Sequence, residues 1–207
     1  MDEFAFTTEK MGVSGSLFDI DKLNDVSKNY LARLGAKTVF NALTAWAKEC
    51  DGDYYNLLMR DEDFTLGMIA IGRGGEKPRK DISHWRQSKE FYSFFFDELF
   101  RREDEFPSNV SDEDRKLILE KYLESYNHND DQSTWFGKIR ALGEELGYAP
   151  QPKLYRKNPE SYKGHVGDVS GVIRVAVTGR QNSPDIWCIQ QVLGEERTIA
   201  RIKAAME

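Results

Sequence analysis

The chain has 207 residues, of which 40% are hydrophobic and 12% aromatic, enough apolar material for one large domain or two small ones and an argument against disorder. Its charged residues sum to −6 at pH 7, with a pI of about 5.3, a balance that does not by itself favour nucleic-acid binding. The sequence contains no long apolar run and begins without the apolar stretch of a signal peptide, so we expect neither a membrane span nor export.

The residues suited to metal binding or redox chemistry are scattered. Cys50 and Cys188 lie far apart in the sequence and fit buried thiols in a reducing compartment. The histidines His84, His128 and His165 stand alone, without the spacing of metal ligands. We therefore expect a cytoplasmic protein with no metal site.

Helical periodicity dominates the first half of the chain. Asp19 is placed to cap a first helix, in which apolar residues such as Leu23 recur at helical spacing with polar residues between them. Further helices are predicted over 37–50, 54–71 and 81–100. The last of these carries a continuous aromatic stripe, which we interpret as core packing.

Helical signals also cover the second half. Ser111 is predicted to begin a helix, because acidic residues follow it where a first turn would lie. A further helix is predicted over 134–146, and a short apolar one over 169–177, whereas 150–167 has the prolines and glycines of an irregular segment.

A helix start is also predicted at Ser183 and Pro184, as a side-chain cap followed by proline at the first helical position. The alternation typical of strands is scarce. The sequence therefore predicts an all-α fold, with a leading segment over 1–30 and two consecutive helical lobes over 31–104 and 105–207.

Catalytic motifs are absent from the sequence. The segment RGGEK at 73–77 resembles a glycine-rich phosphate loop, but it lacks the full spacing of such a loop and the strand that should precede it. Cys188 has no histidine near it in sequence, so a nucleophilic role is not indicated. We assign no catalytic residue.

Two segments, 73–89 and 153–165, interleave basic residues with aromatic, glycine and proline residues. Lysine and arginine bind phosphates, whereas aromatic rings and guanidinium planes stack on splayed bases. A solvated basic loop is the alternative interpretation of each segment. The candidate phosphate contacts are Arg73, Lys77, Lys80, Arg86, Lys153, Arg156 and Lys157.

Two blocks at opposite ends of the chain carry a family resemblance. SGSLFDIDKLN spans 14–24, and IRVAVTG spans 173–179, followed by SPDI at 183–186 and VLGEER at 192–197. In this order they resemble the C-terminal part of bacterial-type glutamyl-tRNA synthetases, a class I aminoacyl-tRNA synthetase family. The resemblance implies a helical anticodon-binding region, with 1–30 as the tail of the stem-contact region.

The resemblance also implies roles for individual residues. Arg174, the arginine of the R-x-A-x-T-G motif, would contact anticodon bases, and Arg79, which follows a proline, would read the third anticodon base. An internal salt bridge is the alternative for Arg174. Thr178 and Gly179 would offer a tight turn with free backbone donors. The next helix would point its positive end toward an anionic ligand. The loop expected to pack against the anticodon comprises Ser183, Pro184 and Ile186.

The resemblance implies that the intact enzyme ligates glutamate to tRNA-Glu using ATP and magnesium. The nucleotide-binding signature and the lysine loop of the family do not occur in this sequence. We therefore expect this chain to bind tRNA, without a cofactor, a membrane contact or an activity of its own. Two alternatives stay open: a stand-alone helical scaffold for protein partners, and a relative that recognises tRNA-Gln or both tRNAs.

Overall fold

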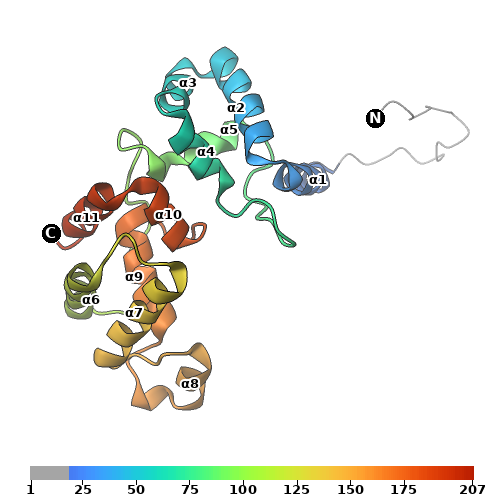
Figure 1. Ribbon diagram of the computed structural model, residues 1–207. Helices are drawn as coiled ribbons and strands as arrows, with labels where there is room; N and C mark the ends of the chain where they lie inside the picture. Colours follow the sequence, from blue (N-terminus) through green and yellow to red (C-terminus); the bar gives the residue numbers. More distant parts are fainter. Residues whose placement is uncertain (1–18) are drawn as a thin grey trace, which may run out of the picture.

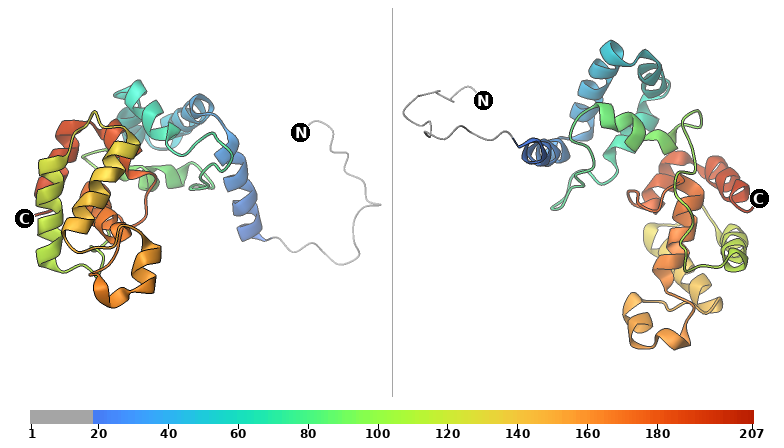
Figure 2. Two further views of the ribbon diagram at one scale, coloured as in Figure 1. Left: turned by 60° about the horizontal axis from the view of Figure 1, so that its bottom comes forward. Right: turned by 180° about the vertical axis from the view of Figure 1, so that it is seen from behind.

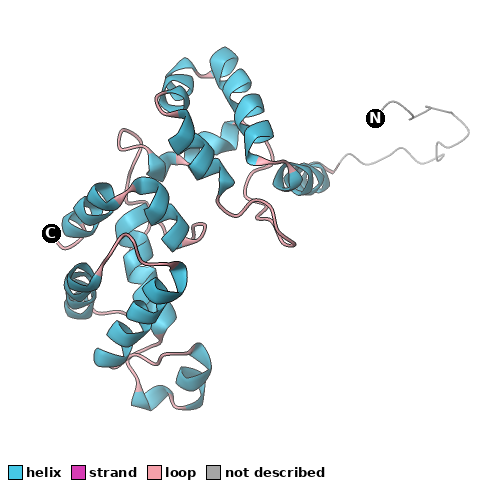
Figure 3. Ribbon diagram, in the orientation of Figure 1, coloured by secondary structure: helices cyan, strands magenta, loops and turns pink. Residues whose placement is uncertain are grey.

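The computed structural model describes residues 19–207, and within that range the chain forms helices and loops without a strand (Figure 3). The predicted all-α fold is thereby confirmed. The helices are α1 (Ile20–Arg33), α2 (Ala36–Cys50), α3 (Gly52–Met59), α4 (Glu62–Ala70), α5 (Arg86–Phe91), α6 (Asp112–Ser125), α7 (Gln132–Glu145), α8 (Pro152–Lys157), α9 (Val166–Thr178), α10 (Ile186–Leu193) and α11 (Glu195–Ala204), with 3-10 turns η2 (Ser93–Phe95) and η3 (Pro159–Ser161).

Short polar side chains fix where most of these helices begin. Each accepts a hydrogen bond from a backbone N–H of the first helical turn, a donor that has no partner within the helix. The predicted starts at Asp19 and Ser111 are confirmed. The residues that cap in this way are Asp19 (α1), Asp51 (α3), Asp61 (α4), Ser111 (α6), Asp131 (α7) and Asp185 (α10).

Two predicted helices are wrong in extent. The segment 54–71 is divided between α3 and α4, because the Asp61 side chain caps a new helix there. The long helix expected over 81–100 is reduced to α5 and η2. Phe94, Phe95 and Phe96 are all buried, which a helix with one buried face does not allow for three successive residues, so the chain turns irregularly through the core. The interpretation of this stripe as core packing is confirmed.

The segment expected to be irregular, 150–167, contains α8 and η3. Its ends are held together by an isolated bridge, in which the N–H of Val166 donates to the carbonyl of Ala149. The helix predicted at 169–177 is longer than expected, since α9 starts at Val166 with His165 and Asp168 in a reciprocal capping box.

The helices form two groups (Figure 1), with α1–α5 in the first and α6–α11 in the second. Helix α9 is the centre of the second group and packs against α6, α7 and α11. Val169, Val172 and Ile173 on α9 are fully buried. The two groups meet where α10 contacts α4, and Figure 2 shows α8 at the end of the second group that lies away from α2 and α3. One hydrophobic cluster runs through both groups, and the division into two lobes stays a prediction.

Charged side chains tie the segment between the groups to the second group. Nη1 of Arg201 donates to the carbonyls of Phe94 and Val177, and its Nη2 donates to the carboxylate of Asp97. Arg180 makes a bidentate ion pair with Glu103. These long-range bonds connect residues 94–103 to the ends of α9 and α11.

The surface of the first group differs from expectation in two places. Several apolar residues of α1 remain exposed, including Leu23 at 49% and Val26 at 65%, whereas Leu31 and Ala32 at its end are buried. Cys50 is exposed and Cys188 half-buried, so the expectation of buried thiols is wrong for Cys50. Within residues 19–207, no helix is both long and apolar enough to cross a membrane.

Candidate nucleic-acid interface

Arg174 lies in the middle of α9 and is held by the loop that precedes α10. Its Nη1 donates to the Ser183 carbonyl at 3.1 Å, the Ser183 Oγ at 2.6 Å and the Pro184 carbonyl at 2.8 Å. Within residues 19–207, its Nε and Nη2 have no hydrogen-bond partner and are not fully buried. The loop therefore orients the guanidinium and leaves one of its edges for a ligand.

The charge of Arg174 is not neutralised by an ion pair among the described residues. Burial lowers the pKa of Arg174, nearby Asp185 opposes that effect, and the positive charge of Arg79 lowers the pKa further. No salt bridge joins Arg174 to Asp168 or Asp185 among the described residues. The two arginines predicted to read the anticodon, from separate helix groups, are therefore close enough for their charges to interact.

Ser183 and Pro184 are buried, and Ile186 is only 4% exposed. Ser183 and Pro184 act on Arg174 through their carbonyls and the serine hydroxyl, so their described contacts are with the protein itself. The predicted cap at Ser183 is wrong. Asp185 caps α10 by accepting from the N–H of Cys188, so a carboxylate already faces the positive end of this helix.

Thr178 and Gly179 are also buried, and the expectation that their turn offers free backbone donors is wrong. The N–H of Gly179 donates to Val175, and the N–H of Arg180 donates to Thr178 Oγ1. Gly179 has a φ of +72°, and a Cβ there would lie 2.2 Å from the Arg101 carbonyl oxygen. Glycine is required because two backbone segments meet at this point.

Arg79 is positioned by the loop that follows α4. Its N–H donates to the Gly72 carbonyl at 2.9 Å, which closes the loop. Gly72 has a φ of +72°, and a Cβ there would lie 2.7 Å from the Arg79 side chain. The guanidinium binds Asp81 through Nε at 3.0 Å and Nη2 at 2.7 Å, which orients it and leaves Nη1 outside that pair.

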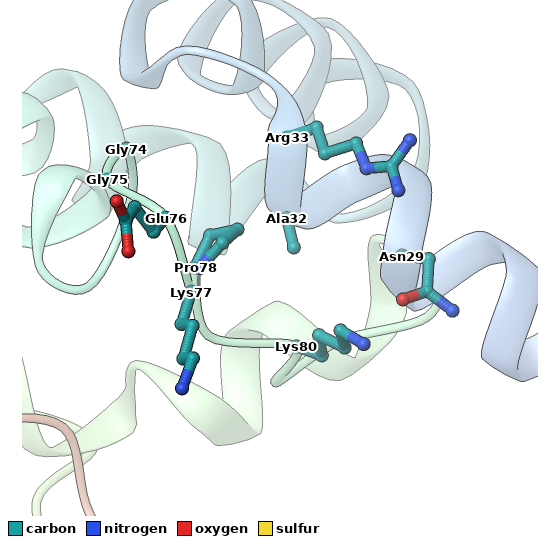
Figure 4. Close-up of a pocket in the computed structure, with 9 residues that line it drawn as sticks. All are labelled: Asn29, Ala32, Arg33, Gly74, Gly75, Glu76, Lys77, Pro78 and Lys80. Atoms are coloured by element: carbon teal, nitrogen blue, oxygen red, sulfur yellow. The ribbon is translucent and has the colours of Figure 1, made fainter.

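The same loop and the end of α1 enclose a pocket of about 640 Å³ lined by three cationic side chains, those of Arg33, Lys77 and Lys80. Figure 4 shows Arg33 on α1, across the pocket from the loop, and the side chain of Lys77 points away from Arg33. Sequence reasoning missed Arg33, which is the last residue of α1 and lies outside the two basic segments singled out in the sequence. Its approach to the loop depends on the packing of α1.

The remaining candidate phosphate contacts differ in their surroundings. Arg73 is half-buried and donates to the Leu31 carbonyl at 2.7 Å, so it fastens the loop to α1. Arg86 is exposed at the start of α5. The exposed cations of α8, which are Lys153, Arg156 and Lys157, lie at the far end of the second group (Figures 1 and 2). The structure does not bring them together with the cations of the 72–86 loop.

The leading motif of the family resemblance is only partly described. Residues 14–18 of SGSLFDIDKLN lie outside the described residues. The remainder begins α1, where Asp19 accepts from the N–H groups of Asp21 and Lys22. This part of the block therefore marks the start of the first described helix.

Comparison with known proteins gives two kinds of similarity. Residues 160–206, which contain α9, α10 and α11, match the family model of an anticodon binding domain. Over 98% of its length the chain is 51% identical to a glutamate–tRNA ligase of Acetivibrio thermocellus, and over 97% it is 42% identical to one of Clostridium perfringens (strain SM101 / Type A). The chain covers 37% of the length of each. These matches confirm the resemblance seen in the motifs: the chain is similar to part of the glutamate–tRNA ligases, and its residues 160–206 are similar to an anticodon binding domain.

Proposed function

We propose that this chain binds the anticodon loop of tRNA-Glu and that Arg174 contacts an anticodon base. The observation that carries the proposal is the geometry of Arg174, whose Nη1 is fixed by three hydrogen bonds while Nε and Nη2 have no hydrogen-bond partner among the described residues. A guanidinium held in this way can donate two bonds to one base edge, which a lysine ammonium does less well. Arg79 is the second proposed reader, since Asp81 orients its guanidinium and leaves Nη1 outside that ion pair.

Two roles among the predicted site residues change in this proposal, and one is kept. Ser183 and Pro184 are positioning residues, because they hold Nη1 of Arg174. Thr178 and Gly179 shape the end of α9. Ile186 stays at the edge of the site, next to Arg174.

The proposed phosphate contacts are the exposed cations of the 72–86 loop together with Arg33: Arg33, Lys77, Lys80 and Arg86. Each lost phosphate contact should weaken binding to all tRNAs alike and lower the salt dependence by about one counterion. The α8 cations form a separate hypothesis, because a tRNA reaching both patches has to extend along the second helix group.

The test is equilibrium binding of tRNA-Glu, tRNA-Gln and an unrelated tRNA to the full chain over a salt series. We expect tRNA-Glu to bind best, with affinity falling as salt rises. Arg174→Ala should cost about 1–3 kcal/mol, the range of one lost base contact. Arg60→Ala, a surface variant on the first helix group, is the control and should bind normally. Equal affinity for all three tRNAs would refute anticodon reading.

The wider setting follows from the relatives. We propose that the chain acts as part of a cytoplasmic glutamate–tRNA ligase, in which ATP and magnesium serve the catalytic centre and the described residues serve recognition. The matches to ligases named for this activity support the proposal. Comparing the affinities for tRNA-Glu and tRNA-Gln distinguishes it from a relative that accepts both tRNAs.

A second candidate function is a scaffold for protein partners. The exposed apolar residues of α1, which are Ile20, Leu23, Val26 and Tyr30, favour contact with another protein surface. A scaffold predicts a stable partner in pull-down experiments and no tRNA binding. The tRNA titration above therefore separates the two functions.

A further inference from the structure

A groove of about 400 Å³ opens beside Arg174, between the first turn of α7, the middle of α9 and the start of α10. Its volume lies in the usual range of small-molecule sites. Its lining includes polar side chains and an exposed aromatic ring. Because Arg174 lines this groove and also leads the candidate nucleic-acid interface, the two are continuous.

The polar part of the lining includes Arg174, Gln132 and Asp185. Nε2 of Gln132 donates to Asp185 Oδ2 at 2.9 Å, while Asp185 Oδ1 accepts from the N–H of Cys188 at 3.0 Å. A carboxylate is only an acceptor, so this bond fixes which way the Gln132 amide points and leaves its carbonyl oxygen as an acceptor. Arg174 and Gln132 thus contribute a donor and an acceptor to the lining of the same groove.

The exposed aromatic side chain in the lining is that of Phe136. The neighbouring Trp135 is only 6% exposed. Trp135 is fixed in the core, where its Nε1 donates to the Tyr122 hydroxyl at 2.9 Å. The Arg140 guanidinium carbon lies 5.3 Å from the Phe136 ring centroid, so a cation already uses this ring. An exposed ring beside a donor–acceptor pair is the arrangement with which proteins hold unstacked bases.

We propose that this groove holds one unstacked anticodon base, with its face on Phe136 and its edge between Arg174 and Gln132. The inference rests on the proposed function and adds a stacking residue and a second polar contact to it. A base fits the groove better than an apolar protein side chain, because only a base offers a planar face and also satisfies the donor of Arg174 and the acceptor of Gln132. Phe136 supplies affinity that tolerates any base, and Gln132 contributes to the choice among bases.

The test begins with binding of an anticodon stem–loop of tRNA-Glu to the full chain and three variants. Phe136→Leu keeps an apolar side chain but removes the stacking face, and should weaken binding about 5- to 150-fold, the range of one lost base–aromatic stack. Phe136→Trp should retain binding within about threefold, because the stacking face remains. Leu117→Ala is the matched control, since Leu117 is an exposed apolar residue of similar exposure on α6, and should bind normally.

Photo-crosslinking with 5-iodouridine, placed at each anticodon position in turn, then locates the base. Crosslinking of one position to a peptide containing Phe136 supports the inference. If Arg174→Ala weakens binding while Phe136→Leu does not, the groove is not the base site and only this inference falls. If the stem–loop does not bind the unchanged chain, the proposed function falls and the inference falls with it.

Discussion

Arg201 is predicted to hold the two helix groups together, and replacing it tests this directly. The side chain is 6% exposed and its Nη1 is shared between the carbonyls of Phe94 and Val177, the second at 2.9 Å. Arg201→Met keeps most of the aliphatic volume but leaves both carbonyls without their donor. Burial lowers the pKa of Arg201, which shows that the guanidinium is held in a poorly solvated place, with the ion pair to Asp97 as partial compensation.

The magnitude follows from the two carbonyl bonds. A hydrogen bond from a charged donor contributes about 1.5–3 kcal/mol, and a buried acceptor left unpaired carries its own desolvation cost. Asp97 is 61% exposed, so its ion pair adds about 0–1 kcal/mol. We therefore expect Arg201→Met to lower the free energy of unfolding by roughly 3–5 kcal/mol.

Urea denaturation followed by far-ultraviolet circular dichroism measures this loss. Arg60→Met is the matched control, because Arg60 forms an exposed pair with Glu98 and its replacement should cost less than about 1 kcal/mol. A loss for Arg201→Met no larger than that of the control would refute the reasoning. It would mean that water or backbone movement satisfies the two carbonyls after the substitution.

Two further predictions concern a glycine and the cysteines. Gly179→Ala should destabilise the chain by roughly 3 kcal/mol or more in the same denaturation assay, because a Cβ would lie 2.2 Å from the Arg101 carbonyl, whereas Gly75→Ala, with a φ of +73° in open space, should cost about 1–2 kcal/mol. Equal losses would show that the close contact is relieved elsewhere. Burial raises the pKa of the Cys188 thiol to about 11, so its reactive thiolate is scarce at pH 8 and increases as pH rises toward 11. Mass spectrometry after iodoacetamide treatment at pH 8 should therefore show the exposed Cys50 modified first, and faster labelling of Cys188 would contradict the assignment.

Local sequence determined the helix starts at Asp19 and Ser111. Asp19 and Ser111 cap helices through bonds to residues two or three positions along the chain, so the signal lies within a single turn. The two motif blocks, at 14–24 and 173–197, also indicated the family without any knowledge of packing. Arg174 could be named as the leading candidate because the residue order alone carries the resemblance.

Only the tertiary structure decided which of the motif residues face solvent. Ser183 and Pro184 belong to the motif, yet they are buried and serve Arg174, because their surroundings come from α9 rather than from their own segment. Phe136 looked like any aromatic residue at helical spacing, and its exposure beside Arg174 depends on how α7 packs against α9. Periodicity specifies that a helix has an apolar face, whereas long-range packing decides which of its side chains remain available to a ligand.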